Sequence, residues 1–461
     1  MLRILCAFLL LPLLPAAQPP DTPAGRTLAA WLEAFNSADR AKIKAFLDVH
    51  PSKWQVEEAL EFREETGGFE LIRIVKSEPT ALTALVKARD AGYFSELTLK
   101  VEAEPPHRIA GMRLMRTALP PGEPAPPRLS QAEALAGWRV QIERRAAADQ
   151  FSGAVLLAKN GKILFSQAYG LADRERTRKN TLETQFRLGS MNKMFTSVAT
   201  LELVEAGKLA LEDPLAKHLP DYPNQELARK VTVRHLLTHT GGTGDIFGPE
   251  YDKNRLKLRT LNDYVKLYGA RGLQFEPGSR WAYSNYGFLL LGVLIERVSG
   301  KSYYDYVREH VFKPAGMKAT DSLPEEQVVK KRATGYMRRE GAWKPNTDTL
   351  PWRGTSAGGG YSTVGDLLRF AEALKKGRLL EPKLVREATS RQKPSPGYGF
   401  GFGVSDEDGM RRFGHAGGAP GMNGDLRVYP DSGYVVAVLA NLDPPAATRL
   451  ADWLEQRLPA R

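Results

Sequence analysis

Cysteine is nearly absent from this chain of 461 residues, whose single cysteine is Cys6. One thiol cannot form an intramolecular disulfide, so the fold must be stabilised by its hydrophobic core, which several hundred residues can supply. No group of cysteines and histidines has the spacing of a metal site, and no glycine-rich phosphate loop precedes a helix. The sequence therefore implies no cofactor.

A long apolar run is also missing, apart from the start of the chain. There Arg3 is followed by the apolar stretch 4–14 and by the small residues Ala16 and Ala17. This pattern is typical of a secretory signal peptide, which we assign to residues 1–17 and which contains Cys6. We expect an exported protein, periplasmic or extracellular, with no transmembrane segment in the mature chain.

Negative charge is in deficit, because 65 Lys and Arg residues face 53 Asp and Glu residues. Basic clusters at 174–179 and 253–259 could face an anionic envelope surface. They lack the interleaved aromatic residues that stack on nucleic-acid bases, so nucleic acid is not an expected partner. We interpret the clusters as solvated surface.

A proline-rich segment at 119–128 divides the chain into two predicted domains, 25–118 and 129–461. The first shows apolar residues at helical spacing, followed by alternating segments, which predicts an α+β domain. It resembles the cone-shaped fold of nuclear-transport-factor-2-like and SnoaL-like domains. Such a domain could bind a ligand, pair subunits or pack against a catalytic unit. The predicted helices span 27–35 and 41–49, and the predicted strands span 69–75, 81–88, 94–101 and 108–115.

The most informative motif is Ser190-Met191-Asn192-Lys193 at the start of an apolar stretch. Residues three apart share one face of a helix, so Ser190 and Lys193 can share a proton. A serine hydroxyl becomes a good nucleophile when a neighbouring base takes that proton. The alternative is that Ser190 only caps the helix. That reading does not explain Lys193, since a cation in the first turn opposes the helix dipole.

Two further motifs follow, each at the edge of a strongly patterned segment. Tyr283-Ser284-Asn285 leads into a predicted buried helix over 286–298, and His415-Ala416-Gly417 precedes a predicted hairpin. Shorter matches elsewhere lack this context, because Ser390-x-x-Lys393 is followed directly by Pro394. Tyr222-x-Asn224 and His239-x-Gly241 are set aside on the same ground.

The ordered set Ser190-x-x-Lys193, Tyr283-x-Asn285 and His415-x-Gly417 resembles the serine hydrolases of the class C β-lactamase and penicillin-binding type. More narrowly, it resembles their esterase and D-peptidase branch. The resemblance covers 129–459 and includes the phrase Leu236-Leu237-Thr238-His239-Thr240-Gly241-Gly242. It implies a β-lactamase/transpeptidase-like α/β (α+β) fold, in which helices flank an antiparallel sheet beside an all-helical lobe.

The resemblance also implies a role for each motif residue. Ser190 attacks a carbonyl group, and Lys193 and Tyr283 transfer its proton, with the identity of the base left open. Asn285 positions the lysine and the substrate amide. The backbone amides of Ser190 and Gly418 form the oxyanion hole. Gly417 and Gly418 suit a strand edge that a substrate approaches closely, although an ordinary flexible turn is the alternative.

The third motif carries His415, where β-lactam-cleaving relatives carry lysine. Histidine is mostly neutral near neutral pH, which disfavours carboxylate-bearing substrates. We therefore expect a small ester, amide or peptide substrate, with esterase-like activity favoured over β-lactam hydrolysis. A D-amino-acid peptidase, a D-Ala carboxypeptidase, a β-lactamase and a catalytically silent envelope-binding protein are the alternatives. His415 could also be a purely structural hydrogen-bonding residue.

A second candidate nucleophile is Ser356 in Gly354-Thr355-Ser356-Ala357-Gly358, which matches the elbow of α/β-hydrolases and is followed by Asp406 and His415. An elbow must join a strand directly to a helix. Two prolines precede this one, and the next predicted helix begins only near Thr363. We therefore interpret 358–360 as a mobile rim of the Ser190 site.

Overall fold

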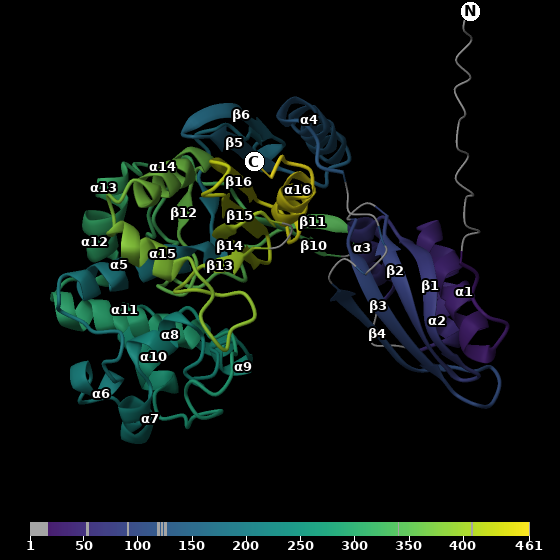
Figure 1. Ribbon diagram of the computed structural model, residues 1–461, viewed down its shortest axis with the longest axis horizontal. Helices are drawn as coiled ribbons and strands as arrows, with labels where there is room; N and C mark the ends of the chain where they lie inside the picture. Colours follow the sequence, from purple (N-terminus) through teal and green to yellow (C-terminus); the bar gives the residue numbers. More distant parts are fainter. Residues whose placement is uncertain are drawn as a thin grey trace, which may run out of the picture. The chain divides into compact units, whose positions relative to one another are not determined.

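The structure is a computed structural model that describes residues 17–51, 55–89, 92–117, 120, 123, 127–339, 341–406 and 409–460, without the side chains of 61 and 65. The predicted signal peptide, with Cys6, lies almost entirely outside the described residues. The chain forms two compact units, Met1–Pro126 and Pro127–Arg461 (Figure 1). Their division falls within the predicted linker.

Unit 1 packs three helices against a four-stranded antiparallel sheet in the order β1-β2-β3-β4. The meander and two of its helices match the prediction from the sequence. The third helix, Val56–Thr66, was not predicted, because its charged residues leave few apolar positions to show a helical period. The elements are α1 (Pro23–Ser37), α2 (Arg40–Val49), α3 (Val56–Thr66), β1 (Phe69–Glu78), β2 (Ala81–Ala88), β3 (Phe94–Val101) and β4 (Ile109–Thr117).

Unit 2 is built on a six-stranded antiparallel sheet in the order β13-β14-β15-β16-β5-β6. The last strands of the chain pair with the first strands of the unit, since β16 lies beside β5 with Val438 opposite Val155. The predicted hairpin is present as β15 and β16. The strands are β5 (Gly153–Lys159), β6 (Lys162–Tyr169), β13 (Gly403–Ser405), β14 (Arg412–Ala419), β15 (Met422–Val428) and β16 (Tyr434–Ala440).

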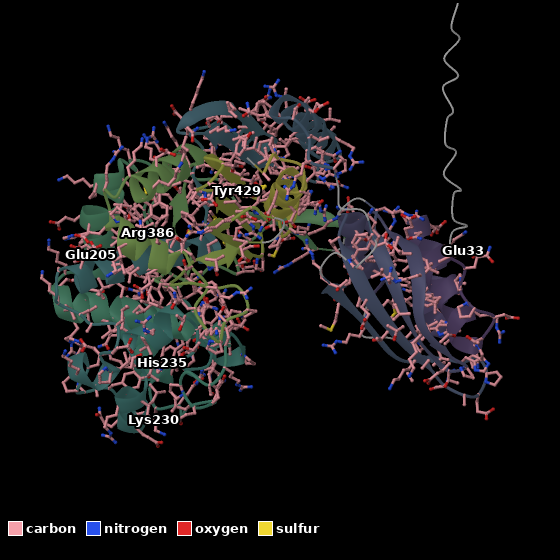
Figure 2. All side chains as sticks on the ribbon, viewed as in Figure 1. Glu33, Glu205, Lys230, His235, Arg386 and Tyr429 are labelled. Carbon is pink, nitrogen blue, oxygen red and sulfur yellow. The ribbon has the colours of Figure 1, made fainter. Side chains whose placement is uncertain are left out.

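Helices cover both faces of this sheet (Figure 1). On one face, α4 (Gln131–Ala147) and α16 (Ala446–Glu455) bury Trp138 and Leu450 against the sheet. On the other face, α5 (Asn192–Glu205) and α14 (Val364–Lys375) enclose Phe195 and Phe370, whose ring centroids are 4.9 Å apart. Figure 2 shows Tyr429 among the crowded side chains of this unit and Lys230 at its outer edge.

A helical lobe lies beside the sheet, as the resemblance implied. Its longest helix, α11 (Asn285–Ser299), is buried over most of its length and ends at Gly300, which has a φ of 69°. The lobe also contains α6 (Leu215–His218), α7 (Gln225–Lys230), α8 (Val233–Leu237), α9 (Pro249–Asn254), α10 (Leu261–Tyr268) and α12 (Tyr303–Val307).

Short elements complete unit 2, and several of them frame the start of α5. The α/β fold with an antiparallel sheet and flanking helices is therefore confirmed. These elements are β7 (Leu171–Asp173), β8 (Arg178–Lys179), β9 (Phe186–Arg187), the 3₁₀ turn η1 (Gly189–Met191), the π-helical turn η2 (Arg308–Phe312), α13 (Lys313–Ala315), β10 (Tyr336–Arg339), β11 (Ala342–Pro345), β12 (Tyr361–Ser362) and α15 (Pro382–Ala388). Among the described residues, no helix combines the length and the hydropathy needed to cross a membrane.

Candidate active site

Ser190 lies in the 3₁₀ turn that leads into the buried helix α5. The turn is possible because Gly189 adopts a φ of 54°, which side chains disfavour. The first turn of α5 has no side-chain cap, since its capping position is Met191. Ser190 therefore does not serve as a helix cap, and its hydroxyl is left for another partner.

Lys193 is completely buried one turn further on, and its Nζ lies 3.2 Å from Ser190 Oγ. The same Nζ donates to Asn285 Oδ1 at 2.7 Å and to the carbonyl oxygen of Ala357. Burial lowers the pKa of Lys193 from 10.5 to about 7, and the Asp245 carboxylate only partly opposes this shift. A neutral amine has two N–H groups for these two acceptors, so its lone pair is left to face Ser190.

Tyr283 stands directly before α11 and joins the same cluster. Lys193 Nζ lies 4.7 Å from the centroid of its ring. Burial raises the pKa of the Tyr283 phenol far above 10, although a hydrogen bond with Ser190 opposes the shift. The phenol thus remains protonated at neutral pH, and it can donate a proton but not accept one.

Asn285 is held by a residue that the sequence analysis did not single out. Asp245 Oδ2 accepts a hydrogen bond from Asn285 Nδ2 at 3.1 Å, and Oδ1 accepts one from the Asn285 backbone, also at 3.1 Å. One of the two amide hydrogens of Asn285 is therefore engaged, and its Oδ1 must face Lys193. Apart from its place just after the glycine-rich phrase 236–242, Asp245 belongs to no recognisable motif.

His415 lies on β14, half-buried, and both of its ring nitrogens have partners. Nδ1 contacts the carbonyl oxygen of Ala416, which can only accept, so Nδ1 carries the hydrogen. Nε2 lies 2.8 Å from the hydroxyl of the buried Tyr398, which donates to it. Burial, followed by the nearby Lys193, lowers the pKa of His415 to about 3, so the ring is neutral. Tyr398 is a second site residue that the motifs did not indicate.

His239 also reaches the site, although its short motif lacks the sequence context of the other three. Its φ is 58°, its side chain is buried, and its Nδ1 accepts a hydrogen bond from the Ser284 backbone at 3.1 Å. Its ring centroid lies 4.3 Å from that of Tyr283. Burial lowers its pKa well below 6.5, so His239 is a neutral ring that supports Tyr283. In the sequence, the family-like phrase 236–242, which contains His239, was the signal that could have indicated this role.

The edge of β14 comes close to the turn that carries Ser190. A Cβ atom on Gly417 would lie 1.9 Å from the carbonyl oxygen of Leu188, so only glycine fits there. A Cβ on Gly189 would lie 3.0 Å from the amide nitrogen of Gly418, which places that amide beside the Ser190 turn. In the described residues, β13 pairs with β14 only as far as Gly414, leaving this part of the edge open.

A cavity of about 490 Å³ opens at the Ser190 turn and the edge of β14. It is reached by Ser190, Asn285 and Gly418. Most of its remaining wall is apolar, which suits the acyl or leaving group of a small substrate. The apolar wall is formed by Ile246, Phe247, Tyr251, Leu350, Pro351 and Met422.

The competing elbow motif fails in the structure. Ser356 is fully buried, and no helix begins until α14 at Val364. Its segment instead supports the Ser190 site: Gly359 donates to the Gly189 carbonyl at 3.1 Å, and Leu188 donates to the Gly360 carbonyl at 3.2 Å. The predicted mobile rim is therefore a wall tied to the turn by backbone hydrogen bonds.

The site combines a half-buried serine with a buried lysine whose pKa is about 7, a protonated tyrosine and an open strand edge. These features define a serine hydrolase of the penicillin-binding type. The chain belongs to the family described as Beta-lactamase, whose sequence profile matches residues 139–461. The resemblance of the catalytic unit is thus confirmed. The match does not include unit 1, whose nuclear-transport-factor-2-like identity stays a prediction.

Individual relatives agree with this assignment. The chain is 32% identical over 292 residues to a putative penicillin-binding protein, PbpX, of Bacillus subtilis, covering 63% of this chain and 70% of that protein. A penicillin-binding protein of Bacillus halodurans matches with a TM-score of 0.62 and 33% identity, over 68% of this chain and 98% of that one. A D-stereospecific amidohydrolase of Streptomyces matches with a TM-score of 0.59 and 28% identity, over 70% of this chain and 99% of that one.

Proposed function

We propose that this enzyme cleaves small carboxylic esters and uncharged amides through an acyl-enzyme formed on Ser190, and that esters are preferred over β-lactams. The observation that carries the preference is the neutral His415, whose two ring nitrogens are both engaged. The signal-peptide pattern of residues 1–17 supports action outside the cytoplasm.

Lys193 acts as the general base in this mechanism. With a pKa of about 7, a large fraction of its amine is neutral at neutral pH. Its lone pair faces Ser190 Oγ at 3.2 Å and takes the hydroxyl proton as the oxygen attacks the substrate carbonyl. The negative charge that develops on the carbonyl oxygen is stabilised by the amides of Ser190 and Gly418.

Tyr283 completes the first half of the reaction as a proton donor. Its phenol stays protonated and hydrogen-bonds to Ser190, so it can deliver a proton to the leaving alkoxide or amine. Lys193 then passes its proton to the resulting phenolate, which restores the phenol and the neutral amine. In the second half, water replaces the leaving group and loses its proton to the same lysine, releasing the acid and free Ser190.

His415 offers no fixed positive charge to a substrate carboxylate. Its Nδ1–H is directed at Ala416, and its Nε2 accepts from Tyr398. Charge-assisted hydrogen bonds are about twice as strong as neutral ones, so a carboxylate loses orientation here. An ester without an acid group does not depend on such a charge for its orientation.

Two arginines, Arg255 and Arg339, also line the cavity. Arg339 forms an ion pair with Asp348 at 3.0 Å, and Arg255 donates to the Asp348 carbonyl. The Asp348 carboxylate therefore balances the charge of Arg339, whereas Arg255 is held by a neutral backbone carbonyl and keeps its positive charge. The proposed preference rests on the neutral His415 and not on these arginines.

Amide cleavage is the second candidate function, because the Streptomyces relative is a D-stereospecific amidohydrolase. The apolar wall and the tyrosine donor also suit an amide leaving group, which must be protonated as it departs. D-amino-acid amides therefore belong in the substrate panel, beside esters and a chromogenic cephalosporin.

The test compares kcat/KM for p-nitrophenyl butyrate, D-alanine p-nitroanilide and nitrocefin. We expect p-nitrophenyl butyrate to exceed nitrocefin by at least about tenfold, which corresponds to roughly 1.4 kcal/mol of transition-state stabilisation. His415→Lys should narrow that gap, whereas His310→Lys, which adds the same charge away from the cavity, should not. A wild-type preference for nitrocefin would refute the proposal.

A catalytically silent protein would show no labelling by a fluorophosphonate probe, which reacts with an activated serine whatever the substrate. We expect labelling of the wild type and of Ser356→Ala, and none of Ser190→Ala. Labelling that survives Ser190→Ala would assign the nucleophile elsewhere.

A further inference from the structure

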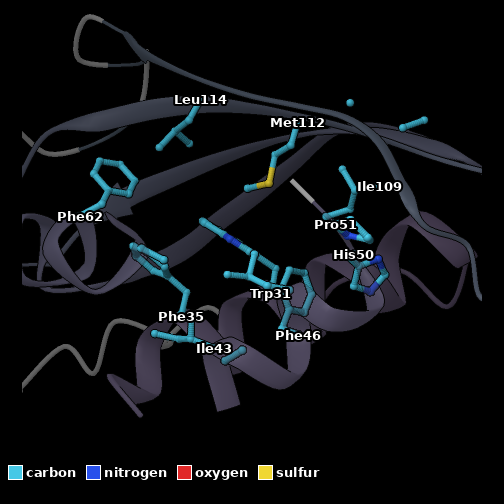
Figure 3. Close-up of a pocket in the computed structure, with 15 residues that line it drawn as sticks. Trp31, Phe35, Ile43, Phe46, His50, Pro51, Phe62, Ile109, Met112 and Leu114 are labelled. Atoms are coloured by element: carbon cyan, nitrogen blue, oxygen red, sulfur yellow. The ribbon is translucent and has the colours of Figure 1, made fainter. Parts of the chain in front are cut away.

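Unit 1 contains a cavity of about 460 Å³ that the hydrolase reaction does not use (Figure 3). It lies between the three helices and the edge strand β4. Cavities of a few hundred cubic ångströms with apolar walls are the usual size and character of small-molecule sites. Its lining comprises Trp31, Ala34, Phe35, Ile43, Phe46, Leu47, His50, Pro51, Ala59, Phe62, Ile109, Ala110, Gly111, Met112 and Leu114.

The cavity has a rigid aromatic side. Trp31 stacks on Phe35 with ring centroids 5.2 Å apart and planes 17° apart, and Phe35 packs against Phe62 at 5.6 Å. The helices bury these residues together with Phe69 and the inner faces of β2 and β3. The opposite side is β4, where Ala110, Gly111 and Met112 are exposed and a Cβ atom on Gly111 would meet open space. The cavity is therefore formed by the way in which the helices pack beside β4.

No carboxylate, ammonium or guanidinium group occurs among the described residues that line the cavity. Of these described lining residues only His50, at the C-terminal end of α2, titrates near neutral pH, and 7% of its surface is exposed. Its ring packs on Phe46 with centroids 4.6 Å apart, and its Nδ1 is buried without a hydrogen-bond partner among the residues that the structure describes. Burial lowers the pKa of His50, so the ring is neutral at neutral pH.

A buried nitrogen without a partner costs free energy, which a hydrogen bond to a bound molecule would recover. We propose that this cavity binds an uncharged, largely aromatic small molecule whose single hydroxyl group, which can both donate and accept, hydrogen-bonds with His50 Nδ1. The absence of charged lining groups disfavours an ionised ligand. The stacked aromatic side favours a flat ring system over a flexible chain, because aromatic rings pack well in offset or edge-on contact.

The site is located with phenylnaphthylamine, an uncharged aromatic amine that fluoresces in apolar surroundings, added to the full-length chain. Ala110→Trp introduces a large ring at an exposed lining position of β4, and Met115→Trp places the same ring on the same strand outside the lining. We expect saturable binding that Ala110→Trp weakens at least about tenfold and Met115→Trp leaves unchanged. Equal binding by both variants, or no saturable binding by the wild type, would overturn the proposal.

The role of His50 is tested by displacement of that probe with α-naphthol and with naphthalene, which differ by one hydroxyl group. One hydrogen bond in a buried site predicts that α-naphthol binds about three- to tenfold more tightly to the wild type. His50→Phe keeps an aromatic ring and should abolish this preference while retaining naphthalene. Equal displacement by the two compounds from the wild type would exclude a hydrogen bond to Nδ1, and with it the proposed ligand class.

Discussion

Two buried cations in the catalytic unit are treated in opposite ways. Arg427 on β15 is surrounded by acids: its Nη2 lies 2.7 Å from Asp425 and 2.6 Å from Asp452, and its Nη1 contacts Glu455. Burial alone would lower its pKa, but these carboxylates raise the pKa well above its usual value. Lys193 is equally buried, yet its three partners are a hydroxyl, an amide and a backbone carbonyl.

The difference separates a structural charge from a reactive one. A buried ion that is fully paired stays ionised and joins parts of the fold, here β15 and α16. A buried amine without a carboxylate in contact gives up its proton near neutral pH and becomes a base. The site therefore depends on the missing acid beside Lys193 as much as on the lysine itself.

Removing the reactive cation should have the largest effect on activity and little effect on the fold. Lys193→Met deletes the proton acceptor, and Lys193→Arg keeps a cation that cannot act as a base, so each should lower kcat/KM for p-nitrophenyl butyrate by about 10³-fold or more. The melting temperature of Lys193→Met should stay within a few degrees, because no buried carboxylate is orphaned. Lys208→Met, at an exposed lysine just beyond α5, is the control. Retained turnover in Lys193→Arg would show that Lys193 is not the base.

Removing the structural cation Arg427 should instead affect stability more than activity. Arg427→Met leaves the buried Asp425 without its partner, which we expect to cost about 3–5 kcal/mol of unfolding free energy in denaturant titrations. The double variant Asp425→Asn with Arg427→Met should recover part of that loss, because no buried charge is then left unpaired. If both variants were as stable as the wild type, the ion cluster would contribute nothing to the fold.

Much of this contrast could be predicted from the sequence. The Ser190-x-x-Lys193 spacing predicted both the shared helix face and the absence of a stabilising role for the lysine. The apolar stretch after Asn285 predicted a buried helix, and α11 spans Asn285–Ser299. The alternation of residues after the first two helices predicted the meander of unit 1, in which each strand pairs with the next along the chain.

What could not be predicted depends on contacts distant in sequence. Asp245 precedes Asn285 by 40 residues, and only the folded lobe brings the carboxylate to the amide. Tyr398 reaches His415 through a loop that has no periodic pattern. His239 was set aside because its short motif was judged by local context, whereas its role comes from packing on Tyr283. The cavity of unit 1 likewise arises from the gap that three helices leave beside an edge strand.

The pH dependence of stability gives a finer measure of the unpaired lysine. The pKa of Lys193 is lowered to about 7 in the fold, against 10.5 for a solvated lysine, so the unfolded chain binds more protons between these values. The free energy of unfolding should therefore rise with pH in this window, by up to about 1.4 kcal/mol per pH unit from this residue. The difference between wild type and Lys193→Met, measured in denaturant at pH 7.5 and 9.5, isolates this contribution. A difference that does not change with pH would mean that Lys193 keeps an ordinary pKa.

The smallest expected effect concerns Asp245, which raises the pKa of Lys193 and holds Asn285 in place. Asp245→Asn removes the charge, so the lysine should lose its proton more readily and the acidic limb of the kcat/KM profile should move to lower pH. The plateau should fall about tenfold, because an amide cannot accept both hydrogen bonds from Asn285 and the orientation of that residue is loosened. Asp252→Asn, at a carboxylate that lines the same cavity, should leave the acidic limb unchanged. If Asp245 were purely structural, Asp245→Asn would lower the pH-independent kcat/KM but leave the acidic limb of the profile where it is. An unmoved acidic limb would therefore contradict electrostatic control of Lys193.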